Sequence, residues 1–176
     1  MFRFLATIFI LINTSPTFGK GYDIFGVGVY DVKFDGSSSN YATDLRYERR
    51  FDNNIVDIGP EEDNFFYLKP FVGLEVTSDT AFYILSGIYL EDNLGQLMTG
   101  DENRWKLTPS FGVGYYDDGD GKKLGNKIEF RTTIEVSYQL DNFDRVGISF
   151  GHISNANIGN KNPGVEVISF SYQKPF

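Results

Sequence analysis

Cysteine is absent from this chain of 176 residues. The absence excludes disulfide bonds, thiolate metal sites and a cysteine nucleophile. Basic residues are also few, because 16 lysines and arginines stand against 24 aspartates and glutamates and give a net charge of −8. This balance argues against nucleic acid as a partner.

No hydrophobic run is long enough for a transmembrane helix. The stretch Phe4–Ile12 is apolar, but it is far shorter than the ~20 residues that such a helix requires. It follows Arg3 and precedes Thr17 and Gly19, which have the spacing of a signal-peptidase site. The sequence therefore predicts a cleaved signal peptide at 1–19 and an exported domain at 20–176.

Aromatic residues and glycines are abundant in the chain, at 16% and 19 residues, and this composition favours strands and tight turns. The clearest strand is 127–140, where apolar residues from Ile128 to Leu140 take the even positions and polar residues such as Glu129, Arg131 and Glu135 take the odd ones. A soluble sandwich also alternates, but a long strand with a charged inner row fits a barrel with a polar lumen better.

Similar alternation marks eight segments, and eight is an even number, as in bacterial single-chain barrels. The predicted strands are 22–32, 41–51, 65–76, 81–90, 105–115, 127–140, 146–154 and 165–173. Turn-forming clusters at 35–40, 117–126 and 141–144 separate several of them. The last strand alternates up to the terminal Phe176, which resembles the insertion signal of outer-membrane proteins. We expect an all-β fold, a single eight-stranded antiparallel transmembrane β-barrel.

His152 is the only histidine of the chain, and strand alternation places it on the apolar, outward face together with Ser154. Glu166 shares the outward phase of the following strand. An antiparallel register with His152 opposite Glu166 also pairs Phe150 with Ile168. A register offset by two residues keeps the faces and moves Glu166 to a diagonal position.

These three outward groups have the composition of a hydrolytic triad. A glutamate can fix the imidazole tautomer, the imidazole can take the hydroxyl proton, and the serine can then attack an acyl carbon. The alternative is that His152, Ser154 and Glu166 are polar residues at the membrane interface with no catalytic role.

The segments His152-Ile153-Ser154-Asn155-Ala156 and Asn162-Pro163-Gly164-Val165-Glu166 resemble the signature of the lipid A 3-O-deacylases of the PagL type. The resemblance is specific over the last ~30 residues and architectural before them. It implies an outer-membrane esterase that acts on lipid A, the lipid of lipopolysaccharide, with no cofactor, and it suggests a homodimer.

The resemblance also implies a role for each site residue. Ser154 corresponds to the nucleophile, His152 to the general base and Glu166 to the acid that orients it. Asn162 falls at the position of an oxyanion-binding asparagine, and Asn157 falls where the family supplies a backbone N–H from a glycine. Asn155 is expected to support the site by hydrogen bonding, although it could simply form a turn.

Two other functions stay open on the sequence alone. A non-enzymatic barrel could serve as an adhesin or an envelope-structure protein, and a phospholipase or acyltransferase could use the same triad on another acyl donor. A weaker pattern, Asp117, Asp118 and Asp120 between glycines, has the flavour of a calcium loop. Because its EF-hand spacing is incomplete, we expect no metal.

Overall fold

A computed structural model of the chain describes residues 20–34, 41–58, 67–99 and 103–176. The predicted signal peptide and the predicted turn at 35–40 lie outside these residues. Eight long strands form one antiparallel sheet: β1 (Gly21–Tyr30), β2 (Ala42–Phe51), β4 (Tyr67–Thr77), β5 (Phe82–Tyr89), β7 (Trp105–Asp117), β8 (Ile128–Gln139), β9 (Arg145–Ser154) and β10 (Val165–Pro175).

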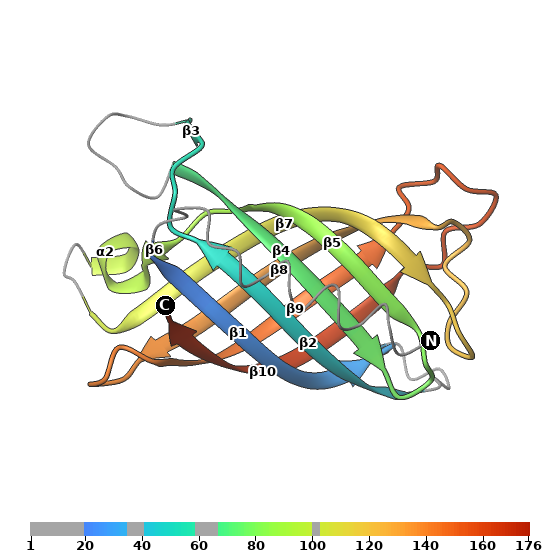
Figure 1. Ribbon diagram of the computed structural model, residues 1–176, viewed down its shortest axis with the longest axis horizontal. Coiled ribbons are helices and arrows are strands. Elements are labelled where there is room, and N and C mark those ends of the chain that lie inside the picture. The colour runs from blue at the N-terminus through green and yellow to red at the C-terminus, as the bar shows by residue number, and fades with distance from the viewer. Residues whose placement is uncertain (1–19, 35–40, 59–66, 100–102) are drawn as a thin grey trace.

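The sheet closes on itself. Neighbouring strands follow the order β2-β1-β10-β9-β8-β7-β5-β4, and β4 pairs with β2 to complete the barrel (Figure 1). The predicted eight-stranded barrel is thus confirmed, with strand ends that differ by a few residues. Pro175 stands in the last strand at its very end, where its missing N–H is tolerated.

The connections on either side of β4 and β5 hold short elements that the sequence did not predict. Strand β3 (Val56–Asp57) pairs with the start of β4, and β6 (Asp92–Asn93) pairs with β7. Helix α2 (Leu94–Thr99) follows β6 directly. In the described part of the chain, no helix has the length and apolarity needed to cross a membrane.

The barrel has two distinct ends. We call the end where β1 begins and β10 finishes the terminal end; α2 and the 141–144 turn also lie there (Figure 1). The loops 118–127 and 155–164 lie at the opposite end. Because β9 runs away from the terminal end, its last residue, Ser154, belongs to the opposite end.

Strand alternation gives the barrel an apolar exterior and a lumen that is filled by side chains. In β8 the odd positions Glu129, Arg131 and Glu135 are buried, whereas the even positions Ile128 and Ile134 are exposed. The predicted facing of this strand is therefore correct.

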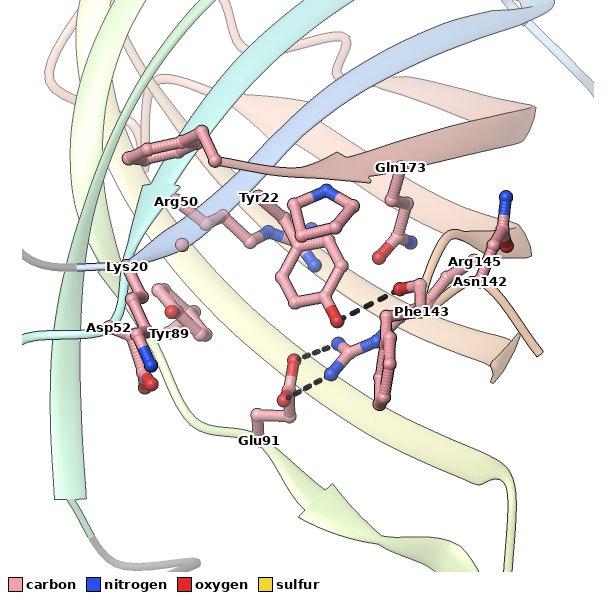
Figure 2. Close-up of a pocket in the computed structure, with 13 residues that line it drawn as sticks. Lys20, Tyr22, Arg50, Asp52, Tyr89, Glu91, Asn142, Phe143, Arg145 and Gln173 are labelled. Carbon is pink, nitrogen blue, oxygen red and sulfur yellow. Dashed lines mark hydrogen bonds and ion pairs between the residues drawn. The ribbon is translucent and has the colours of Figure 1, made fainter. Parts of the chain in front are cut away.

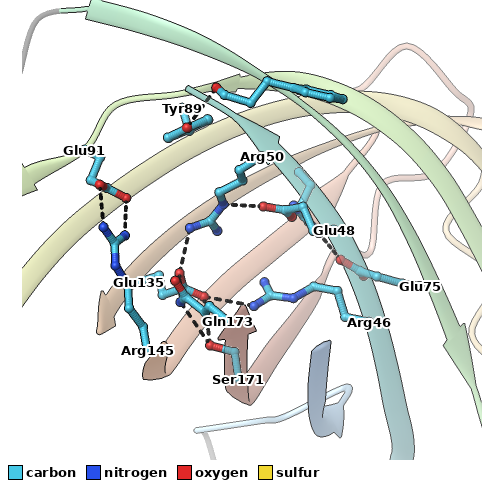
Figure 3. A network of polar contacts seen from close by, with 12 residues as sticks. Arg46, Glu48, Arg50, Glu75, Tyr89, Glu91, Glu135, Arg145, Ser171 and Gln173 are labelled. Carbon is cyan, nitrogen blue, oxygen red and sulfur yellow. Dashed lines mark hydrogen bonds and ion pairs between the residues drawn. The ribbon is translucent and has the colours of Figure 1, made fainter. Parts of the chain in front are cut away.

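An ion-pair network crosses the lumen (Figure 3). Its members are all buried and come from three strands: Arg46, Glu48 and Arg50 of β2, Glu75 of β4, and Arg131 and Glu135 of β8. In the closed order β2 and β8 are four strands apart in either direction, so their side chains meet across the full width of the lumen.

Glu135 is the central acceptor of this network. Its carboxylate accepts from Arg46 Nη2 at 3.0 Å, from Arg50 Nη1 at 2.7 Å and from Gln173 Nε2 at 2.8 Å. On the other side of the network, Arg131 pairs with both Glu48 and Glu75. Charges so far from water persist only when each is paired in this way.

Toward the opposite end the sequence did not predict a cluster of buried apolar side chains, which lies beside the buried carboxylates of Asp44 and Glu129. The buried cluster there includes Tyr30, Tyr83, Tyr116 and Ile153. The hydroxyl of Tyr30 donates to that of Tyr116 at 3.0 Å, and Tyr116 donates to the carbonyl of Lys122 at 2.7 Å. These contacts tie the 118–127 loop to the barrel wall.

The terminal end holds a cavity of about 430 Å³ that is lined by charged, polar and aromatic side chains (Figure 2). Arg145 crosses its wall to Glu91, with nitrogen–oxygen distances of 2.7 and 3.1 Å. Burial alone would raise the pKa of Glu91, but the Arg145 guanidinium holds that pKa below its usual range. Arg50 and Gln173 also line this cavity, so it opens directly onto the ion-pair network.

The network predicts the effect of removing its central acceptor. Glu135→Leu would leave the Arg46 and Arg50 guanidinium groups buried without that partner, so we expect the free energy of unfolding to fall by about 3–5 kcal/mol. Denaturant titration of the barrel in detergent micelles measures this loss. Asp141→Ala is the control, because it removes an exposed partner of Arg104, and an ion pair screened by solvent contributes little to the free energy of unfolding. Equal losses for the two variants would contradict a structural role for the network.

Candidate active site

Strands β9 and β10 pair in the predicted register. His152 lies opposite Glu166, and Phe150 lies opposite Ile168. The alternative register, offset by two residues, is wrong. All four side chains belong to the outward rows of their strands, so they project from the exterior of the barrel.

The imidazole and the carboxylate are in contact. His152 Nδ1 lies 3.2 Å from Glu166 Oε1, and the two side chains are 43% and 33% exposed. Because a carboxylate can only accept, Nδ1 must carry the proton of this hydrogen bond. The neutral ring then has its lone pair on Nε2, where it can accept a proton from a hydroxyl.

Ser154 stands two residues beyond His152 on the same outward row. At that spacing the Cα atoms are roughly 6.6–6.8 Å apart, and both side chains are partly exposed. In the described part of the chain no hydrogen bond joins the Ser154 hydroxyl to the imidazole, so rotation of the side chains is needed to complete this contact. Such looseness is common in active sites without substrate.

Gly164 lies against the imidazole, which the sequence did not reveal. Its φ is +60°, and a Cβ atom at this position would lie 2.8 Å from His152 Cε1 and 3.4 Å from Nε2. A side chain would therefore both strain the backbone and push the ring away from its position. The positive φ and the contact with the imidazole thus explain why a glycine stands at position 164.

Asn162 is fixed next to the serine. Its Oδ1 accepts from the backbone N–H of Asn155 at 3.0 Å, and Asn155 follows Ser154 directly. Since the oxygen of the Asn162 amide is used toward the backbone, its Nδ2 group is the one left to donate to another acceptor. The structure thus brings Asn162, Asn155 and Ser154 together.

Asn155 anchors the loop that carries these groups. It is fully buried, and its Nδ2 donates to the carbonyl of Leu124 at 2.8 Å and to that of Lys161 at 2.7 Å. Asn155 also begins a turn, because its carbonyl accepts from the backbone N–H of Ile158 at 3.0 Å.

The 118–127 loop contacts the site through Leu124, whose carbonyl accepts the hydrogen bond from Asn155. Leu124 is 1% exposed and belongs to the apolar cluster that fills this end of the lumen. We did not predict this support from the sequence, although Leu124 is the one apolar residue in the polar run 117–126. Gly125, with a φ of +96°, brings its backbone close to the carbonyl of Lys161.

Asn157 is placed less closely. It is exposed and has a φ of +63°, after Ala156 at +52°. No hydrogen bond of the described residues connects it to Ser154, His152 or Asn162. The left-handed conformation is one that glycine adopts freely and asparagine tolerates better than most residues. This conformation explains how an asparagine can stand at position 157, where the family resemblance implies a glycine.

The acidic loop at 117–120 is engaged by a lysine. Lys127 Nζ lies 2.8 Å from Asp117 Oδ2 and 3.2 Å from Asp118 Oδ1, and its hydrogen bond lowers the pKa of Asp118. Over the described ranges, no group of three or more histidine, cysteine, aspartate or glutamate side chains is arranged to hold a metal ion.

Comparison with known proteins adds a family match. The family model described as "Lipid A 3-O-deacylase (PagL)" matches residues 70–175. The lipid A deacylase PagL of Bordetella bronchiseptica is 31% identical over 55 residues, which is 31% of this chain and 31% of that protein. The match therefore spans about a third of the curated relative's length.

Two solved structures share the fold. The crystal structure of the outer membrane enzyme PagL aligns with a TM-score of 0.63 and 17% identity, covering 88% of this chain and 99% of that one. A de novo designed transmembrane β-barrel aligns with a TM-score of 0.59 and 10% identity, covering 93% of this chain and 100% of the design. At these identities the likeness concerns the barrel alone.

The contact between His152 and Glu166 can be tested without an activity assay. Glu166→Ala removes the acceptor of the Nδ1 proton, so we expect the neutral ring to move toward the Nε2–H tautomer. The chain has a single histidine, and nitrogen NMR of the labelled barrel in micelles reads its tautomer directly. Glu166→Gln retains an acceptor oxygen and should keep more of the Nδ1–H form. An unchanged tautomer in Glu166→Ala would show that the contact does not hold the ring.

Proposed function

The chain belongs to the lipid A 3-O-deacylase (PagL) family, and from this premise we propose that it hydrolyses the 3-O-linked acyl ester of lipid A with Ser154, His152 and Glu166. The proposal depends above all on one observation: the His152–Glu166 pair is formed on the exterior of the barrel, with Ser154 next to it on the same face. A lipid ester can reach such a site from the membrane without entering the lumen.

The protein is located in the bacterial outer membrane, and the aromatic residues on its surface indicate where the site lies relative to the membrane. Exposed aromatic side chains lie toward both ends of the barrel, with Trp105 at the terminal end and Tyr41 and Tyr115 at the opposite end. Aromatic girdles of this kind mark the two membrane interfaces. With both termini in the periplasm, Ser154 at the end of β9 would lie at the level of the outer leaflet, where lipopolysaccharide resides.

The proposed first step forms an acyl-enzyme. Nε2 of His152 takes the hydroxyl proton of Ser154 while Oγ attacks the ester carbonyl, and Glu166 stabilises the resulting imidazolium. When the tetrahedral intermediate collapses, the C–O bond to the sugar breaks and the sugar oxygen receives the proton from His152.

The second step returns the enzyme to its starting state. His152 takes a proton from a water molecule as that water attacks the acyl carbon. The serine oxygen leaves and regains its proton, and the products are a free 3-hydroxy fatty acid and a lipid A that lacks one chain.

Asn162 is proposed to stabilise the oxyanion. Its Nδ2 group is not used by the bond that fixes its Oδ1, and it belongs to the loop that contacts the residue after the serine. The N–H of Asn157 stays a prediction for the second donor, as does a homodimer for the assembly.

The nucleophile and the product can be tested together by mass spectrometry of lipid A. Gram-negative cells that express the unsubstituted chain should lose one 3-hydroxyacyl mass from their lipid A. Cells with an equal outer-membrane amount of Ser154→Ala should keep it. Identical spectra from the two folded barrels would instead favour a binding protein or an enzyme with another lipid substrate.

The role of Asn162 can be separated from its structural bond. Asn162→Asp keeps an oxygen that accepts from Asn155 but lacks the amide donor, so we expect kcat to fall by roughly 10²- to 10³-fold. Asn160→Asp is the matched control, because it adds the same charge at an exposed position of the same loop. If both variants lost activity equally, added charge would be the cause and the oxyanion role would be rejected.

A further inference from the structure

The segment that leaves β1 crosses over to the catalytic strand pair. Asp31 turns the chain with a φ of +61°. The next residue, Val32, donates its backbone N–H to the carbonyl of Glu166 at 3.0 Å. Asp31 is also ion-paired with Lys122 of the 118–127 loop. Residues 31–34 are thus attached both to the backbone of the proposed triad and to the loop beneath it.

This attachment places the ring of Phe34 on the lipid-facing side of the site. The ring centroid lies 6.1 Å from that of Phe150, at an interplanar angle of 55°. Phe150 is in the outward row of β9 two residues before His152, and Ile168 lies opposite it on β10. Despite the contact with Phe150, Phe34 remains 73% exposed.

An acyl chain bound for hydrolysis must pass this place. Its carbonyl carbon would lie at Ser154, at the membrane surface, and its tail would run toward the membrane interior. The outward row of β9 leads in that direction from Ser154 past His152 to Phe150, a distance of roughly 13 Å for four residues. A long acyl chain spans this distance, whereas a butyryl chain ends well before it.

We propose that Phe34 is a specificity-determining residue that selects long acyl chains, by forming one wall of an acyl path over Phe150 and Ile168. The inference rests on the proposed function, because it takes Ser154 as the point of attack. The exposed face of the Phe34 ring gains apolar contact only when a chain long enough to reach it is bound, so its contribution grows with chain length.

The test compares two synthetic substrates that differ only in chain length. They are 3-O-acylated glucosamine 1-phosphates with a 3-hydroxymyristoyl or a 3-hydroxybutyryl group, presented in detergent micelles to the purified full chain. We expect Phe34→Ala to lower kcat/KM about tenfold for the long chain and to leave the short chain within about twofold. Phe34→Leu, which keeps an apolar side chain, should recover most of the loss.

Two controls separate this inference from the proposed function. Phe143→Ala removes another exposed phenyl ring, at the terminal end, and should leave the ratio of the two substrates unchanged. Ser154→Ala should abolish hydrolysis of both. A ratio unaltered by Phe34→Ala, or an equal loss on both substrates, would overturn the acyl path while Ser154→Ala still supports the esterase. Hydrolysis that survives Ser154→Ala, or a native chain inactive on both substrates, would overturn the proposed function itself.

Discussion

The barrel depends on the ion pairs between β2 and β8, because the charged side chains that fill its lumen must be paired. A closed sheet of eight strands has an interior just wide enough to be filled by side chains, and here those side chains carry charge. Glu135 meets Arg46 and Arg50 from the opposite wall, and the network fills the middle of the lumen. Because these groups hold the polar interior together, the exterior is free to carry an unrelated set of residues, and the proposed site belongs to that exterior.

Much of the proposed site follows from strand alternation, which is why it could be predicted from sequence. A period of two decides that His152, Ser154 and Glu166 face outward, and the register with His152 opposite Glu166 also pairs Phe150 with Ile168, although an offset by two residues would keep the same faces. The structure has the register with His152 opposite Glu166. The closed eight-stranded barrel followed from the same regularity, repeated along the chain.

What could not be predicted depends on irregular backbone. The contact of Gly164 with the imidazole depends on a φ of +60°, and the crossing of residues 31–34 onto β10 depends on a turn at Asp31. The buried apolar cluster at the opposite end was missed for another reason. Inward positions near a strand end, such as Ile153, look like ordinary strand residues until the 118–127 loop is known to cover them.

The hydrogen bond from Asn155 to the carbonyl of Leu124 affects how much of this chain would be needed to transfer the proposed active site to another barrel. The three proposed catalytic groups lie on one hairpin, within 152–166, and face away from the lumen, so a designed barrel could receive them with the correct register. Such a graft would lack the neighbouring loop whose carbonyl holds Asn155. The smallest segment that could be transferred is therefore β7 to β10. In this segment the 118–127 loop, between β7 and β8, holds the 155–164 loop, between β9 and β10, in place.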